Sequence, residues 1–322
     1  MSIKSILRTN ILTRNFYVYL QKRRDERVLK KRLKYHGQFI NRSTGSDKLL
    51  IILAGYKDFL YPAIFSRIEK NLLPDIDVCL ISSGKYSEEL AALGEKNGWS
   101  YLSTKENNLC LVQNVALKLH PNAKLIFKLD EDIFVTENYF ENMLKAYEHA
   151  KSGEYSPGIL APMIPINGYS HMRILEKLGL KEVYSEKFER AQYIAGPTRK
   201  IENDPEVAKF FWGEGGYVPT IDELNARFSK EPIAETVCPI RFSIGAILFE
   251  RVLWEEMGYF HVDRRSSQLG EDEAQICAYC LINSKPVAVS ENVVVGHLSF
   301  GKQNAVMKEY YLSHKELFTI QK

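Results

Sequence analysis

The chain has 322 residues, of which 45% are hydrophobic, and this length can bury a sizeable core as one large α/β domain or two smaller ones. Residues 1–43 hold 12 Lys/Arg against 2 Asp/Glu, while the other residues hold 31 against 38, so the net charge of +3 divides into a basic arm and an acidic body. Five cysteines are too few for a disulfide framework and indicate reduced thiols of a cytoplasmic protein. No stretch approaches the ~20 apolar residues of a membrane span, and there is no clear signal peptide.

The basic arm, residues 1–47, is expected to be an amphipathic helix followed by a linker at 41–47. Large apolar side chains lie among its charges: Ile3, Ile6, Leu7, Ile11, Leu12, Phe16, Tyr17, Tyr19 and Leu20. Such a helix could bind an anionic membrane surface, pack on the body of the protein, or bind nucleic acid. We favour the membrane, at the inner face of the cell membrane, because no base-reading module follows and nucleic acid is not an expected partner.

From residue 48 onward, strand-like apolar runs alternate with helical patterns. Strands are predicted at 49–55, 76–82 and 99–103, and helices at 59–72, 87–97, 108–119 and 137–150. This alternation predicts βαβ units and parallel strands covered on both faces, with ligands at the carboxyl ends of the strands. No GxGxxG or GxxxxGK[ST] pattern is present, so a phosphate-bearing ligand would depend on a metal.

The run 124–135 contains Asp130, Glu131 and Asp132 between apolar residues and is predicted to be one buried strand. Alternation along a strand would put Asp130 and Asp132 on one side and Glu131 on the other. Two converging carboxylates repel each other, and a hard divalent cation such as Mg²⁺ would offset that repulsion. The alternative is an acidic turn at the end of a strand.

The rest of the chain is less regular. Residues 151–235 form a Pro- and Gly-rich insertion, in which Trp212 and Tyr217 could stack on an acceptor sugar or simply pack on the sheet. A strand is predicted at 240–249 and another at 293–297, which ends in His297, a ligand or a structural histidine. Between them Glu271, Asp272 and Glu273 open a helix, where acids are also expected from the helix dipole alone.

Together these motifs resemble the GT-A class of nucleotide-sugar-dependent glycosyltransferases, in particular its family 2-like branch. The resemblance rests on Asp130-Glu131-Asp132 as a D-x-D motif, the run 242–249 with 254–260 ending in G-x-F, the G-E-D of residues 270–272, and Gly296-His297. It implies an α/β fold with a Rossmann-like mixed sheet flanked by helices. The domain would comprise a nucleotide-sugar-binding half (48–150), an irregular acceptor-side insertion (151–235), an acceptor and catalytic half (236–300) and a C-terminal tail (301–322).

The resemblance also implies roles for single residues. Asp130, Asp132 and His297 would hold Mn²⁺ or Mg²⁺ against the diphosphate of the donor. Asp272 would deprotonate the acceptor hydroxyl as general base. Tyr56 would lie against the nucleobase, and the other donor-binding residues would be Ala54, Ser83, Asn114 and Asp130.

The sequence departs from the family pattern around the nucleobase. Ser82-Ser83 stand where an acid is usual, Gln113-Asn114 where Arg-Asn is frequent, and Ala-Gly-Tyr-Lys (54–57) where Pro-x-Tyr-Asn is commoner. The base and the sugar of the donor therefore stay open.

The predicted function is sugar transfer from a nucleotide-diphosphate sugar to a hydroxyl of a glycan or lipid-linked glycan, with inversion, in the synthesis of a surface polysaccharide or glycolipid. One alternative is a sugar-nucleotide pyrophosphorylase, for which a Gly-rich segment with Arg and Lys should directly follow the first strand. Another is a non-catalytic glycan- or lipid-binding protein of the same fold.

Overall fold

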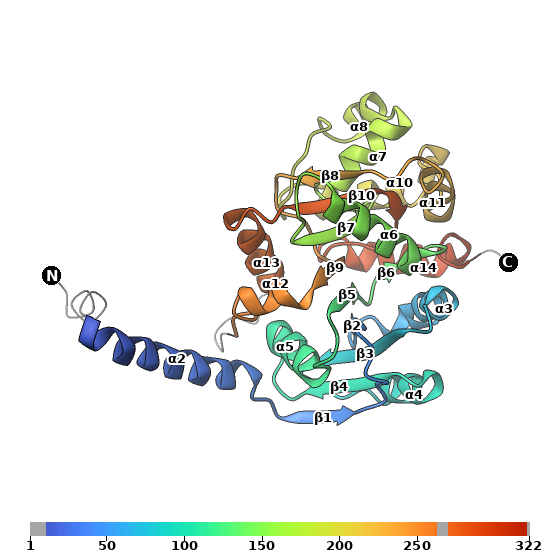
Figure 1. Ribbon diagram of the computed structural model, residues 1–322. Helices are drawn as coiled ribbons and strands as arrows, with labels where there is room; N and C mark the ends of the chain where they lie inside the picture. The colour runs from blue at the N-terminus through green and yellow to red at the C-terminus, as the bar shows by residue number, and fades with distance from the viewer. Residues whose placement is uncertain (1–10, 263–269, 321–322) are drawn as a thin grey trace.

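A computed structural model describes residues 11–262 and 270–320, and within them the chain forms a mixed nine-stranded sheet flanked by helices (Figure 1). The predicted fold class, a mixed α/β sheet with helices on both faces, is confirmed. The strands are β1 (Gly37–Ile40), β2 (Lys48–Leu53), β3 (Ile76–Ser83), β4 (Ser100–Thr104), β5 (Leu125–Asp130), β6 (Ile133–Phe134), β7 (Ile159–Met163), β8 (Glu235–Cys238), β9 (Ala246–Glu250), β10 (Val287–Val294) and β11 (Gly296–His297).

The helices connect these strands and cover the sheet. The α-helices are α2 (Ile11–Leu33), α3 (Tyr61–Asn71), α4 (Glu88–Asn97), α5 (Leu109–Leu119), α6 (Tyr139–Ser152), α7 (Ser170–Leu178), α8 (Lys181–Lys187), α9 (Lys200–Asn203), α10 (Pro205–Phe211), α11 (Ile221–Phe228), α12 (Arg251–Glu256), α13 (Glu271–Ile282) and α14 (Asn304–Ser313). Short 3₁₀ helices are η1 (Asp58–Leu60), η2 (Glu214–Gly216) and η3 (Lys315–Leu317).

The sheet order is β1-β4-β3-β2-β5-β9-β7-β10-β8. Strands β4, β3, β2 and β5 run parallel, as the βαβ pattern predicts, whereas β9 is antiparallel to both of its neighbours, β5 and β7. Helices α3 and α4 lie on one face of the parallel half and α5 on the other, because the chain reverses its direction across the sheet between β4 and β5 (Figure 1). That reversal places the carboxyl ends of β2, β3 and β5 side by side.

Local sequence explains the parallel half well. All eight residues of β3 are buried, and five of them are apolar, as expected for a strand covered on both faces. The side chains of Ser87 and Asn108 cap α4 and α5 by accepting hydrogen bonds from the backbone N–H groups of Leu90 and Leu111. Both helices therefore begin one residue after their predicted starts.

Two predicted strands are shorter than expected. The run 240–249 is strand only from Ala246, where β9 begins. The prediction of one strand over 124–135 is wrong in its second half: β5 ends at Asp130, Glu131 and Asp132 form a turn, and β6 begins at Ile133. β6 leaves the main sheet and pairs with β11, with Ile133 opposite His297.

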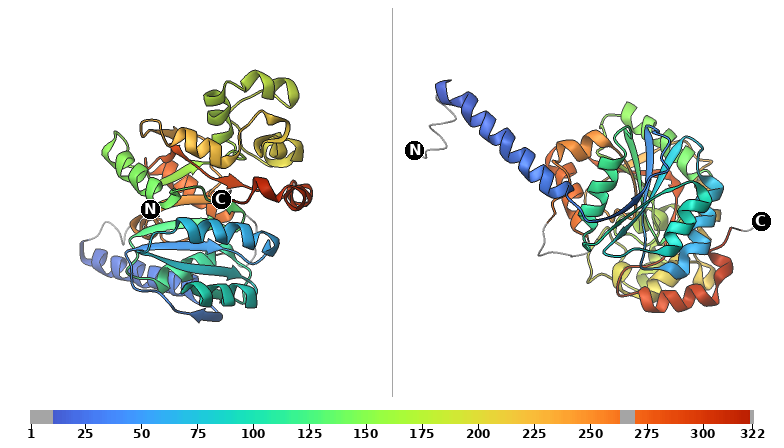
Figure 2. Two further views of the ribbon diagram at one scale, coloured as in Figure 1. Left: turned by 90° about the vertical axis from the view of Figure 1, so that its right-hand side faces the viewer. Right: turned by 90° about the horizontal axis from the view of Figure 1, so that it is seen from below.

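The basic arm contains the long helix α2, which projects from the body and contacts it through its C-terminal end (Figures 1 and 2). There α2 packs on α5, and Arg32 donates to the carbonyl of Gly258. The sheet begins earlier than the predicted domain boundary at residue 47, because β1 pairs with β4. Within the described residues, no helix has the length and apolar character needed to cross a lipid bilayer.

Candidate functional site

The candidate site begins where β2 and β5 end side by side. Leu53 is paired with Asp130 in the parallel ladder, so Ala54 and Glu131 follow next to each other. Glu131 is 8% exposed and accepts hydrogen bonds from the backbone N–H groups of Gly55 (2.7 Å) and Tyr56 (3.0 Å). Gly55 has a φ of +132°, a conformation that side-chain-bearing residues rarely adopt. Glu131 therefore holds the loop that carries Tyr56 and Lys57.

Tyr56 and Ser83 are brought together, as the sequence predicts. The Tyr56 hydroxyl donates to the Ser83 carbonyl at 2.6 Å, while its side chain remains 56% exposed. Ser83 and Ala54 are both buried, and the Lys85 ammonium lies 4.8 Å from the Tyr56 ring centroid. The structure thus presents an accessible aromatic face at the carboxyl ends of β2 and β3, where a planar base could stack.

Asp132 lies at the meeting point of three segments. Its Oδ2 is 3.3 Å from His297 Nε2 and 2.5 Å from the ammonium of Lys57. The Asp132 backbone carbonyl accepts from Leu298 N at 3.0 Å, which fixes the turn against the strand that carries His297. Two residues of the predicted metal set, Asp132 and His297, are therefore in contact.

His297 is positioned by close packing of the insertion. The preceding Gly296 has no room for a side chain, since an added Cβ would lie 2.4 Å from the indole of Trp212. Trp212 is 3% exposed, and its Nε1 donates to the His297 carbonyl at 3.1 Å. Trp212 thus packs the insertion onto β11, the second of the two roles considered for it. Tyr217 is 41% exposed, with Lys187 over its ring.

The third predicted metal residue, Asp130, faces a different cation. The Lys128 ammonium, buried within β5, is 2.7 Å from Asp130 Oδ1 and donates to the Ile244 carbonyl at 2.8 Å. Burial raises the pKa of Asp130 to about 6, against the opposing effect of Lys128. Burial would also raise the pKa of Asp132, but the Lys57 ammonium holds it well below its ordinary value. The two carboxylates of the D-x-D motif therefore have different environments.

Whether these residues fit a divalent cation is decided by His297. Its Nδ1 lies 3.2 Å from the carbonyl oxygen of Ile166, which can only accept, so Nδ1 must be the donor. In the neutral ring, Nε2 then has a free lone pair beside Asp132 Oδ2, which is the tautomer of metal-binding histidines. Asp132 Oδ2 already contacts one cation, the ammonium of Lys57.

A cation fits the Asp132–His297 pair on these grounds. Over residues 11–262 and 270–320, no group of three or more His, Cys, Asp or Glu side chains is arranged to hold a metal ion. Two protein ligands are nevertheless enough for a cation such as Mg²⁺ that takes the rest of its ligands from substrate phosphates and water.

Asp272 lies in the first turn of α13 and is 4% exposed. Its Oδ2 accepts a hydrogen bond from Gln113 Nε2 of α5 at 2.8 Å. Its charge also acts on Asp130 and on the ammonium of Lys128, so the predicted base lies near the carboxyl end of β5. The segment 263–269, which precedes α13, lies outside the described residues.

Glu273 follows Asp272 in the first turn of α13, and its side chain is 12% exposed. Its Oε1 is 3.1 Å from Arg241 Nε, and burial raises the pKa of Glu273 to about 7 in spite of that arginine. Arg241 also pairs with the buried Glu202 of the insertion.

Asn114 is not brought to this edge of the sheet. Its side chain is fully buried, and its Oδ1 accepts from Trp254 Nε1 at 2.8 Å and from Phe260 N at 3.0 Å. Its Nδ2 donates to the Phe260 carbonyl. With these bonds Asn114 fastens the G-x-F turn to α5, and we leave it out of the candidate site.

Four site residues were missed from the sequence: Lys57, Gln113, Lys128 and Glu131. Lys57 stands where the commoner family pattern has Asn, and Gln113 where it has Arg, so each departure was itself a signal. Lys128 interrupts an apolar strand two residues before Asp130, and a lone cation in a buried strand requires a nearby carboxylate. Nothing local distinguishes Glu131, because its partners lie 75 and 76 residues away.

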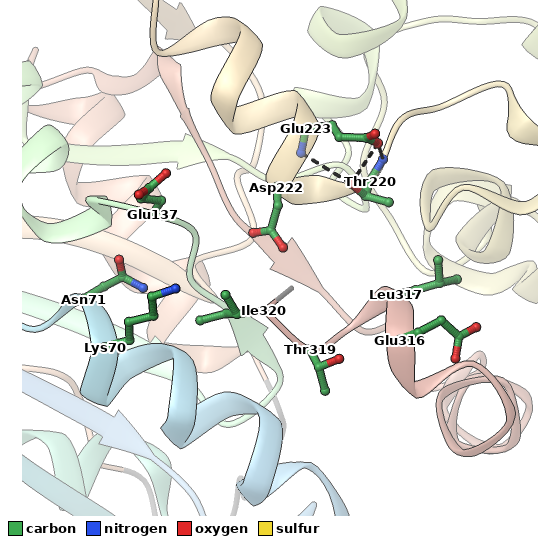
Figure 3. Close-up of a pocket in the computed structure, with 10 residues that line it drawn as sticks. All are labelled: Lys70, Asn71, Glu137, Thr220, Asp222, Glu223, Glu316, Leu317, Thr319 and Ile320. Atoms are coloured by element: carbon green, nitrogen blue, oxygen red, sulfur yellow. Dashed lines mark hydrogen bonds between the residues drawn. The ribbon is translucent and has the colours of Figure 1, made fainter. Parts of the chain in front are cut away.

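A pocket of about 280 Å³ lies elsewhere, between α3, α11 and the segment after α14 (Figure 3). Its lining carries four acids and one lysine: Glu137, Asp222, Glu223, Glu316 and Lys70. Asp222 is paired with Arg67, which is 1% exposed. None of the predicted site residues lines this pocket.

No protein-family model matches the chain, and no curated protein sequence is similar to it. Among solved structures it is similar to the mannosyltransferase PcManGT from Pyrobaculum calidifontis in complex with GDP-Man and Mn²⁺, at 12% identity and a TM-score of 0.46, over 91% of this chain and 69% of that one. It is also similar to S. aureus TarS 1–349 in complex with UDP, at 13% identity and a TM-score of 0.41, over 77% of this chain and 60% of that one. These identities are too low to transfer the role of any residue.

Proposed function

We propose that the chain is a metal-dependent glycosyltransferase, which moves a sugar from a nucleotide-diphosphate sugar to a hydroxyl of a glycan acceptor. The proposal rests on one observation: the accessible Tyr56, the Asp132–His297 pair and the Asp272 carboxylate gather around the carboxyl ends of β2, β3 and β5. In open α/β sheets, ligands bind at that edge.

Each residue has a role that follows from its surroundings. Tyr56 offers a stacking face to the nucleobase, with Ser83 and Ala54 nearby. Asp132 and His297 would hold Mn²⁺ or Mg²⁺ near Asp130, and the bound cation would stabilise the negative charge of the leaving diphosphate. Asp132 can do so at neutral pH because the Lys57 ammonium keeps its pKa low, so that it is ionised.

Asp272 would accept the proton of the acceptor hydroxyl. Gln113 orients the carboxylate by donating to Oδ2, which leaves Oδ1 to face the acceptor. A single base of this kind fits direct displacement with inversion at the anomeric carbon. Lys128 lies beneath Asp130 and limits the mutual repulsion of the acids gathered there.

The helix α2 suggests where the acceptor is held. Its 23 residues include eight Lys/Arg and two Asp/Glu. Phe16, Val18 and Tyr19 are each more than half exposed among these charges. We infer that α2 binds an anionic membrane surface, as a peripheral enzyme acting on a lipid-linked glycan would require. Sedimentation with anionic vesicles should be lost in Phe16→Ser/Tyr19→Ser, and equal sedimentation with neutral vesicles would contradict this role.

The reaction is tested with a panel of nucleotide sugars, by measuring the release of nucleoside diphosphate with and without Mn²⁺. The wild-type chain should release it from one donor and only with metal, and Asp132→Asn should not. Release that is unaffected by both chelation and Asp132→Asn would refute the proposed role of this site.

A further inference from the structure

Lys57 has a position that the proposed reaction does not by itself explain. It follows Tyr56 in the loop held by Glu131, and its ammonium contacts Asp132 Oδ2 (2.5 Å) and Asn304 Oδ1 (3.3 Å). Its side chain is 22% exposed, so part of it is accessible to a ligand. A lysine side chain is a cation at neutral pH, with an ordinary pKa of about 10.4.

The ammonium and a divalent cation would compete for the same oxygen. Lys57 Nζ and His297 Nε2 both contact the same oxygen of Asp132, Oδ2. A metal ion held by Asp132 and His297 would lie beside the Lys57 ammonium, and like charges at such separations repel strongly in a poorly hydrated site. As long as Lys57 remains in place, the free metal ion should bind weakly.

A diphosphate removes this conflict. It brings two or more negative charges to the mouth of the site and gives the ammonium a new partner, while its oxygens complete the coordination of the metal. The flexible four-carbon side chain of Lys57 can reorient without movement of the backbone, which Glu131 holds through Gly55 and Tyr56.

We propose that Lys57 is a displaceable counter-cation of Asp132: it excludes the free divalent cation, and it pairs with a diphosphate oxygen once metal and nucleotide enter together. This inference rests on the proposed metal–nucleotide site and adds that the metal ion and the nucleotide bind to it together. Metal and nucleoside diphosphate should each raise the affinity of the site for the other, and by the same factor.

The test is the binding of Mn²⁺ alone, measured by calorimetry on the full chain, in the wild type and in Lys57→Met. Methionine keeps most of the side-chain volume and removes the charge. We expect Lys57→Met to bind free Mn²⁺ at least about tenfold more tightly, within the usual range of such couplings. The mutual enhancement between Mn²⁺ and GDP or UDP should shrink in the same variant. Lys57→Arg should behave like the wild type.

Lys85→Met is the matched control, because Lys85 also lies beside Tyr56 but does not contact Asp132. It should bind Mn²⁺ alone as the wild type does. If the wild type binds Mn²⁺ with a nucleotide while Lys57→Met binds free Mn²⁺ no more tightly, the inference is overturned and the proposed function stands. If neither protein binds Mn²⁺ under any condition, the proposed metal site itself is refuted, and the inference with it.

Discussion

Glu131→Gln tests the claim that a buried carboxylate holds the loop of Tyr56 and Lys57. Two backbone N–H groups converge on the Glu131 side chain, at 2.7 and 3.0 Å, and it is 8% exposed. Glutamine has the same shape but is neutral. Because Tyr56 N lies 3.0 Å from both Glu131 oxygens, an amide oxygen at the Oε2 position can accept from both N–H groups, while the NH₂ group faces Tyr56 N. Replacing a charged acceptor by a neutral one weakens each of the two hydrogen bonds by about 0.5–1.5 kcal/mol, or about 1–3 kcal/mol together. We expect the free energy of unfolding to fall by that amount.

The assay is urea-induced unfolding, with hydrogen exchange at the Gly55 and Tyr56 amides as a local readout. Tyr61→Phe is the control. The Tyr61 hydroxyl contacts Glu131 Oε2, the oxygen that accepts from Gly55 N, at the longer distance of 3.4 Å. Removing that weaker bond should cost ~0.5 kcal/mol or less. If Glu131→Gln costs no more than Tyr61→Phe and exchange at the two amides is unchanged, Glu131 does not hold the loop.

Three further predictions concern the base, its neighbour and the far side of α3. Asp272→Asn should keep Mn²⁺-dependent nucleotide binding but lower transfer by about 10²–10⁴-fold, the usual contribution of a general base; near-normal transfer would move this role to another group. For Glu273, burial raises the pKa from 4.5 to about 7. The folded state therefore binds this proton more tightly than the unfolded chain does. As the pH rises from 4.5 to 7, the contribution of Glu273 to the stability of the folded state falls. The melting temperature of Glu273→Gln relative to the wild type should therefore rise from pH 4.5 to pH 7, and parallel pH profiles would show that the pKa is not raised. Arg67→Met removes the donor from two buried carbonyls, those of Val135 and Phe318. At ~1–3 kcal/mol each, this loss should destabilise the chain by about 2–6 kcal/mol. Asp222→Asn keeps those two bonds and should cost clearly less in the same unfolding assay, and equal losses would assign the effect to the ion pair.

The parallel half of the fold could be predicted because its signals are local. Continuous apolar runs give buried strands, and Ser87 and Asn108 mark the starts of helices. The position of β9 could not be predicted, because it lies between β5 and β7, which precede it by about a hundred residues. The predicted strand at 240–249 is not a strand before Ala246. In that segment the Ile244 carbonyl accepts a hydrogen bond from the ammonium of Lys128. A propensity pattern does not contain that long-range bond.

The sequence indicates candidate residues for this site but not the partners of each side chain. Asp132, His297 and Asp272 lie near the carboxyl ends of the central strands, whereas Asn114 is fully used by Trp254 and Phe260. The strict alternation expected for Asp130 and Asp132 failed because β5 ends between them. What decides the chemistry of these acids is their cation, Lys128 for Asp130 and Lys57 for Asp132. Only the fold shows which lysine meets which carboxylate.

The most direct test of the proposed function is the thermal stability of the chain with a panel of nucleoside diphosphates, each with and without Mn²⁺. A ligand present at about 100 times its dissociation constant stabilises the folded state by about 2.7 kcal/mol. We predict a rise in melting temperature with one nucleobase, only when Mn²⁺ is present, that disappears in Asp132→Asn. A rise that does not need the metal, or that survives in Asp132→Asn, would contradict a metal–diphosphate site at Asp132 and His297.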